Sequence, residues 1–215
     1  MSATGKLFET IAQGQANDLE LLLADTPELA QGRDANGVSA FMMAMYYGKA
    51  EMAGVVRQYL GELDLFEAAT AGDTARINEV IQDSSQVNSR SADGFTALHL
   101  ACFFNQPPVV ALLLQAGADV NVVAENPSKV QPLHSAIACQ SVEIVKHLLA
   151  AGAQVNAAQH GGWTALQAAA KHGNRHLVEI LLQHGADPRQ QADDGQTAIS
   201  MAVDDSIRVL LEGHR

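Results

Sequence analysis

Histidine and carboxylate side chains are the groups in this sequence whose spacing could support metal or acid–base chemistry. His172 and His176 stand four residues apart, which on one continuous helix would suit a metal ion. With Asp204 and Asp205 they could form a metal-dependent hydrolase site. A Gly-Asn pair separates the two histidines at an expected turn between helices. We therefore expect solvated loop histidines and predict no metal site.

Two further histidines occupy the same place in a repeated motif. His99 follows Leu98 and His134 follows Leu133, each two residues before an alanine. A catalytic role would need a nucleophile or carboxylate held on the same side, and none recurs with the motif. The glycines lack the adjacent Lys-Ser/Thr of a phosphate-binding loop. We therefore expect structural histidines, and we predict no catalytic residue, no cofactor and no enzymatic activity.

The composition is that of a globular protein, and we expect it to be cytoplasmic. The chain has 215 residues, of which 47% are hydrophobic and 17% charged, too apolar to stay disordered. No run of about 18 apolar residues could span a bilayer, and the first residues lack the apolar core of a secretory signal. Cys102 and Cys139 lie in apolar stretches without metal or disulfide spacing, so we expect buried free thiols.

The net charge limits the classes of partner that the chain can bind. With 24 acidic and 13 basic side chains, the formal charge is −11, which disfavours nucleic acid and anionic membranes as partners. A partner protein with a basic surface would suit this charge. Aromatic residues are only 5% of the chain, so any cluster of them is informative.

A leucine-centred segment recurs along the chain. Leu98, Leu133, Leu166 and Ile199 are separated by 35, 33 and 33 residues. After Leu98, Leu133 and Leu166 the chain has a second apolar stripe with helical spacing. Each of these stripes ends at a glycine, namely Gly117, Gly152 and Gly185. Towards the N-terminus the steps are 33 residues to Leu65, then 24 to Phe41 and 34 to Leu7. We expect about six such units.

Each unit is predicted to be two short antiparallel helices followed by an extended turn. Thr96, Thr164 and Thr197 can cap the first helix of their units, and the glycine ends the second. No unit could bury its apolar face alone, whereas stacked neighbours bury a continuous core. The predicted fold is therefore an all-α repeat solenoid with short projecting hairpin fingers between units.

These units resemble the ankyrin repeat, with its period of about 33 residues and T-P-L-H-x-A signature. The match covers nearly the whole chain and is strongest from Asp93 to Gly185. It includes Thr96-Ala-Leu-His-Leu-Ala101, where Ala97 replaces the proline, and Gly117-Ala-Asp-Val-Asn121. In the resembled family the motif histidine bonds the preceding threonine and neighbouring backbone, and the concave groove faces the partner. The resemblance implies a protein-binding function.

Departures from the period predict local differences. The 24-residue step is too short for a finger, so residues 61–64 are predicted to be a tight connection where the stack bends. The 35-residue step lengthens the finger near Asn126. Both terminal units are expected to be polar caps. We predict one repeat domain over residues 1–215, with an N-terminal block 1–60 and a C-terminal block 65–215.

The few aromatic residues concentrate where the resembled fold has its concave groove. Tyr46-Tyr47, Phe103-Phe104 and Lys171-His172 share the position at the end of the first helix, and Val38, Phe95, Val130 and Trp163 share the finger position. Aromatic residues dominate binding hot spots, although some of these, Phe103 especially, could instead pack between repeats. We predict that the following residues bind a partner: Tyr46, Tyr47, Phe95, Phe103, Phe104, Val130, Trp163, Lys171 and His172.

The sequence favours a non-enzymatic protein–protein interaction module that acts as a monomer. A homo-oligomeric structural subunit is the alternative, followed by the metal-dependent hydrolase described above.

Overall fold

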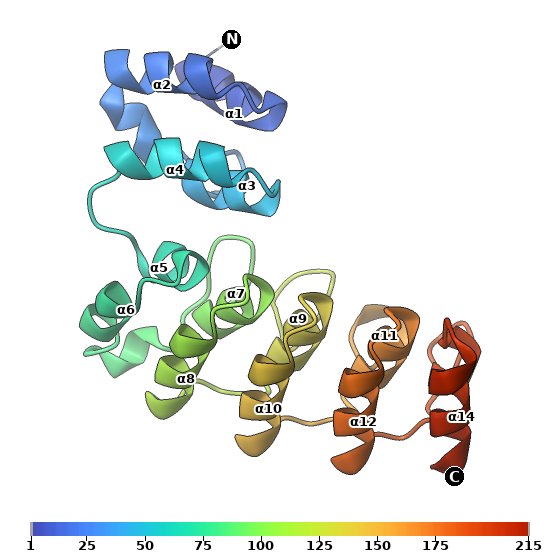
Figure 1. Cartoon of the computed structure of the whole chain (residues 1–215). Helices are drawn as coiled ribbons and strands as arrows, with labels where there is room; N and C mark the ends of the chain where they lie inside the picture. The colour runs from blue at the N-terminus through green and yellow to red at the C-terminus, as the bar shows by residue number, and fades with distance from the viewer. Residues whose placement is uncertain (1, 215) are drawn as a thin grey trace.

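The computed structural model describes residues 2–214, and within them the chain folds into a row of helix pairs (Figure 1). The pairs are α1 (Ala3–Gln13) and α2 (Ala16–Asp25), α3 (Ala40–Tyr46) and α4 (Ala50–Tyr59), α5 (Leu65–Ala71) and α6 (Thr74–Val80), α7 (Ala97–Phe103) and α8 (Pro107–Gln115), α9 (Pro132–Ala138) and α10 (Val142–Ala150), α11 (Ala165–Lys171) and α12 (Arg175–Gln183), and α13 (Ala198–Met201) and α14 (Asp205–Gly213). Three short 3₁₀ turns are η1 (Pro27–Gln31), η2 (Ser84–Gln86) and η3 (His160–Gly162).

The expected count of about six units is too low by one. The seven motif positions from Leu7 to Ile199 each lie in the first helix of a pair, so the described residues form seven helix pairs. Even the shortened last unit keeps both helices, although α13 has only 4 residues. The all-α solenoid is otherwise as predicted, and no β pairing beyond isolated bridges occurs in residues 2–214.

The short helices depend on their neighbours for stability. Most first helices have 7 residues, well below the length at which a helix is stable in isolation. Leu98, Leu133 and Leu166, the central positions of the repeated motif, are at most 1% exposed. The repeat register read from the sequence therefore coincides with the buried face of the first helices.

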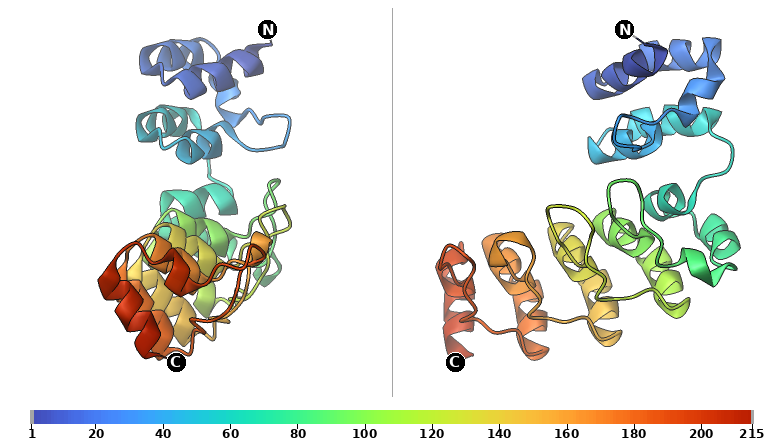
Figure 2. Two further views of the ribbon diagram at one scale, coloured as in Figure 1. Left: turned by 90° about the vertical axis from the view of Figure 1, so that its right-hand side faces the viewer. Right: turned by 180° about the vertical axis from the view of Figure 1, so that it is seen from behind.

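Hairpin fingers project to one side of the stack (Figure 2). We call the segments 33–39, 90–96, 124–130, 158–164 and 192–196 the fingers. Neighbouring fingers are joined by backbone hydrogen bonds in which one finger's N–H donates to a carbonyl of the finger before it. These bonds run from Glu125 to Gly94 at 2.9 Å, from His160 to Ser128 at 3.0 Å and from Asp193 to Gly161 at 2.9 Å.

The stack bends between α4 and α5 (Figures 1 and 2). Residues 60–64 join these helices without a finger, and the first helices α3 and α5 stay in contact while the second helices α4 and α6 make almost none. The bend brings finger 33–39 directly against finger 90–96. A Cβ atom on Gly37 would stand only 2.8 Å from the Cβ of Ala92.

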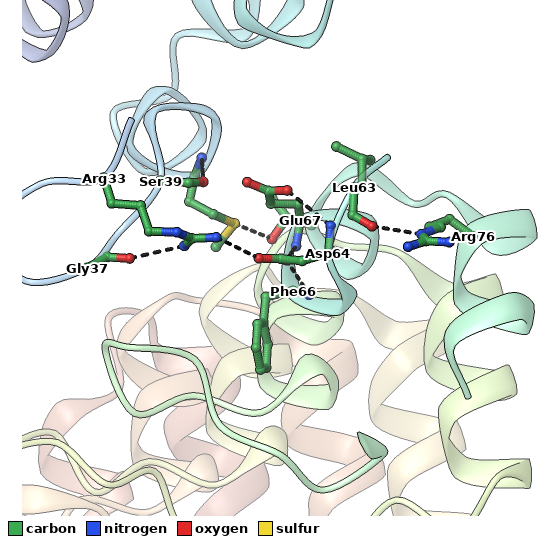
Figure 3. Close-up of polar contacts among 10 residues, drawn as sticks. Arg33, Gly37, Ser39, Leu63, Asp64, Phe66, Glu67 and Arg76 are labelled. Carbon is green, nitrogen blue, oxygen red and sulfur yellow. Dashed lines mark hydrogen bonds and ion pairs between the residues drawn. The ribbon is translucent and has the colours of Figure 1, made fainter. Parts of the chain in front are cut away.

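Polar contacts hold the connection in place (Figure 3). The Asp64 carboxylate caps α5 by accepting from the backbone N–H groups of Phe66 and Glu67 at 2.9 and 2.8 Å. Arg33 donates to the Gly37 carbonyl and to the Asp64 carboxylate, both at 3.1 Å. Arg76 Nε donates to the Leu63 carbonyl at 2.7 Å, while the Leu63 side chain is 1% exposed. The connection is thus anchored by one buried side chain and two guanidinium groups.

Candidate functional site

The motif histidines carry a structural hydrogen-bond network. His99 Nδ1 accepts from the backbone N–H of Thr96 at 3.3 Å and lies 2.9 Å from its hydroxyl. The ring proton therefore belongs on Nε2, which donates to the carbonyl of Val130 at 3.1 Å in the next unit. Burial lowers the pKa of His99 from 6.5 to about 4, so the neutral ring is the stable form near neutral pH.

The next two units make the same two hydrogen bonds with different residues. His134 accepts from the Gln131 N–H at 3.0 Å and donates to the Ala157 carbonyl at 3.1 Å, and burial likewise lowers its pKa. In the next unit Gln167 accepts from the Thr164 N–H at 2.7 Å and its amide donates across to the following finger. A glutamine can thus replace the histidine, which fits a role in joining units.

His172 and His176 do not share a helix. His172 is the residue that ends α11, whereas His176 lies in α12, where its Nδ1 is 3.8 Å from the carboxylate of Glu179. Asp204 caps α14 by accepting from the backbone N–H of Ile207 at 2.9 Å. Within residues 2–214, no three His, Cys, Asp or Glu side chains gather as they would around a metal ion.

Both cysteines are free thiols, and a hydrogen bond joins the two residues. The Cys139 thiol donates to the backbone carbonyl of Cys102 at 3.0 Å, and Cys102 is fully buried. Burial raises the pKa of both thiols, which disfavours the reactive thiolate.

Three of the predicted aromatic residues meet at the bend. The rings of Tyr46 and Phe104 lie 5.7 Å apart, and Phe103 packs edge-on against Phe104 at 5.2 Å. The Tyr46 hydroxyl donates to Asp93 in finger 90–96 at 2.6 Å. Tyr46 and Phe104 are partly buried and pack against the core, so their contact holds units two and four together.

Two aromatic side chains at this position remain open to solvent. Tyr47 is 52% exposed and Phe103 is 47% exposed. The finger residues are less accessible: Phe95 is half-buried against the His99 ring at 5.8 Å, and Val130 is half-buried and accepts the His99 hydrogen bond through its carbonyl.

The remaining three predicted residues form a separate pocket. Trp163, Lys171 and His172 line a cavity of about 230 Å³ between α9, α11 and finger 158–164. The Lys171 ammonium lies 4.7 Å from the centre of the Trp163 ring. The other lining residues are His134, Ala138, Gln159 and Ala168.

A second cavity marks the place of the missing finger. It measures about 170 Å³, lies between fingers 33–39 and 90–96, and includes Phe66, Arg33, Asp64 and Arg90 in its lining. Sequence reasoning missed this cavity, as well as the contact of Asp93 with Tyr46. The only signal for either was the 24-residue step, which brings units two and four together.

Comparison with known families agrees with this geometry. Residues 65–159 and 157–215 match the model of a family described as ankyrin repeats in three copies. The chain belongs to the ankyrin-repeat family. Helices α1–α4 precede the matched ankyrin residues and continue the same stack of helix pairs. Ankyrin repeats are general protein–protein interaction modules and are typically non-enzymatic.

The ankyrin-repeat relatives are parts of larger proteins. The chain is 32% identical over 139 residues to the B-cell lymphoma 3 protein homolog of Mus musculus, covering 65% of this chain and 31% of that protein. It is 34% identical over 161 residues to the human (Homo sapiens) BCL-6 corepressor-like protein 1, covering 74% of this chain and 7% of that protein. It is 31% identical over 140 residues to the tyrosine-protein kinase HTK16 of Hydra vulgaris, covering 59% and 17%. The chain thus spans less than a third of each of these relatives.

The ankyrin helices are short. None of those in residues 2–214 combines the length and the apolar character needed to cross a membrane.

Proposed function

We propose that this chain is a non-enzymatic module that binds a partner protein along the inner groove, between the first helices and the fingers. The exposure of Tyr47 and Phe103 carries the proposal. Both are large aromatic side chains at the ends of first helices, and both are about half exposed. Aromatic residues in this setting are typical of binding hot spots, because they bury a large area at a small cost in conformational entropy.

The experiment measures the affinity of a partner purified with the protein from its native source. Tyr47→Ala and Phe103→Ala should each weaken binding by about thirtyfold, the effect of a hot-spot truncation of about 2 kcal/mol. Val209→Ala is the matched control, because Val209 is 67% exposed on α14, away from the groove. If all three variants bind the partner with the same affinity, the interface lies elsewhere on the chain. If Tyr47→Ala and Phe103→Ala instead lower the free energy of unfolding, these aromatic side chains serve packing.

A second candidate is self-association through the ends of the stack. Val203 and Val209 in the last unit are 62% and 67% exposed, and Leu21 in the first is 71% exposed, so both ends carry apolar side chains. We favour the monomer, since these side chains are few and scattered. Sedimentation velocity over a hundredfold range of concentration distinguishes the two, and a concentration-dependent dimer would support the second candidate.

We also propose a cytoplasmic location, which the two free cysteines support because disulfides are rare in reducing compartments. Imaging a fluorescent fusion in the native cell tests it.

A further inference from the structure

The pocket around Trp163 differs in charge from the acidic chain as a whole. None of its seven lining residues is acidic, and it contains the exposed side chains of Lys171 and His172. This is unusual in a chain with 24 acidic and 13 basic residues. The pocket therefore favours an acidic group, whereas the acidic molecule as a whole attracts basic groups.

The Lys171 ammonium has no carboxylate partner within the described part of the chain. Its contact is with the face of the Trp163 ring, 4.7 Å away. A cation–π contact orients the ammonium and leaves its hydrogen-bond donors available. By contrast, acidic side chains of this chain form ion pairs with five arginines, namely Arg33, Arg76, Arg90, Arg175 and Arg208.

The His134 ring adds neither charge nor a free donor to the pocket, and Gln159 adds a neutral amide. Both ring nitrogens of His134 are already used, Nδ1 by the Gln131 N–H and Nε2 by the Ala157 carbonyl. Ala138 and Ala168 contribute only methyl groups to the lining. What the pocket provides is an aromatic wall, an oriented ammonium and a neighbouring imidazole.

We propose that this pocket receives a glutamate or aspartate side chain from an extended segment of the partner protein. The carboxylate meets Lys171 and His172, and the methylene stem lies against Trp163. This assignment rests on the proposed function, in which the groove binds a protein, and it specifies the chemistry of one contact.

The spacing of the repeats sets where this acidic residue must stand. Phe103 ends α7, and the pocket lies two helix pairs further along, at α11. Packed helices lie about 8–10 Å apart, so two steps span about 16–20 Å. An extended chain advances about 3.3 Å per residue, so an apolar residue on Phe103 and the acidic residue stand about five or six positions apart. The unit between them has Ala138 and Cys139 at the equivalent positions, which leaves room for the segment to pass.

Trp163 makes the test direct, because it is the only tryptophan in the chain. Its fluorescence is titrated with capped ten-residue peptides of serine, threonine and glycine that contain one leucine and, five positions on, one glutamate. A second peptide has glutamine in place of the glutamate. Wild-type protein should bind the glutamate peptide about fivefold more tightly, the upper range for a solvent-accessible ion pair.

Variants of the protein connect that preference to Lys171. Lys171→Met should abolish the preference for glutamate, and Lys171→Arg should retain most of it. Lys146→Met is the matched control, because Lys146 is an exposed lysine on α10. Circular dichroism confirms that each variant remains folded.

Three results would overturn the proposal: equal binding of the two peptides, equal loss with Lys146→Met, or no binding of either peptide at millimolar concentration. The proposed function is judged separately by Tyr47→Ala and Phe103→Ala against the purified partner. If those variants weaken the partner while the two peptides bind equally, the groove binds protein and the acidic contact alone is wrong.

Discussion

The hydroxyl of Tyr46 donates a hydrogen bond of 2.6 Å to the carboxylate of Asp93, although the two residues belong to helix pairs that are not neighbours in sequence. Tyr46 ends α3 in the second pair, and Asp93 lies in the finger before the fourth. The bond therefore crosses the third pair, which has no finger of its own. Together with the Tyr46–Phe104 ring contact it braces the bend.

Removing this hydroxyl should loosen the bend. Tyr46→Phe keeps the ring against Phe104 but removes the donor to Asp93, so we expect a loss of about 1.5–3 kcal/mol in the free energy of unfolding, the value for a hydrogen bond to a charged group. Urea denaturation measures it. Asp93→Asn combined with Tyr46→Phe should lose less than the sum of the single changes. Strict additivity would show that the two side chains do not interact in solution.

The motif histidine should make stability depend on pH. The pKa of His99 is about 4 in the folded chain against an ordinary 6.5, so folding favours the neutral ring. The shift in pKa corresponds to about 3 kcal/mol in the free energy of unfolding. This contribution is fully present above pH 6.5 and is lost as the pH falls from 6.5 through 4.

His99→Gln tests this without removing the bonds, since Gln167 makes the equivalent bonds in its own unit. The variant should fold and show a smaller loss of stability between pH 6.5 and 4 in urea melts. An unchanged pH profile would rule out His99 as the source.

The buried leucine positions should dominate stability. Leu98 is fully buried, so Leu98→Ala should lower the free energy of unfolding by about 2–5 kcal/mol through the cavity that it leaves. Leu21→Ala makes the same chemical change at a side chain that is 71% exposed, and should cost less than about 0.5 kcal/mol. Similar losses from both in denaturant melts would mean that the repeat register is wrong.

Arg76 should protect the connection between the two blocks. Its guanidinium binds the Leu63 carbonyl and the Glu62 and Glu79 carboxylates, at 2.7, 3.1 and 3.0 Å. We expect limited proteolysis to spare residues 60–64 in the wild type and to cut there in Arg76→Ala, because exposed backbone is the usual site of nicking. Arg208→Ala, which removes a surface pair with Asp205, is the control. Rapid cleavage of the wild type at this place would contradict the anchored connection.

The repeat register could be predicted because it depends on local periodicity. Leu98, Leu133 and Leu166 recur at spacings of 35 and 33 residues and are all buried in the structure. The number of units follows from the same positions, because the seven from Leu7 to Ile199 each mark one helix pair, one more than the expected count of about six.

The arrangement of the predicted groove residues depended on distances that the sequence does not contain. Trp163 and Lys171 come from one unit, so their contact follows from the geometry of a single repeat. Tyr46 and Phe104 are brought together only by the angle of the bend, and that angle follows from the contacts of a connection without a finger. The pattern could therefore predict that these aromatic residues share a surface, but not that Tyr46 is engaged with Asp93.

The near absence of contact between α4 and α6 also bears on how the chain folds. In a linear array each unit is stabilised by its own helices and by its coupling to the next, and folding spreads along the array through those couplings. At this one junction the second helices contribute almost nothing, and the coupling is carried by the first helices, by the contact of fingers 33–39 and 90–96 and by the bracing around Tyr46. Cooperativity is therefore weakest there, and the five pairs from α5 to α14 can remain folded as a unit while the two pairs from α1 to α4 unravel.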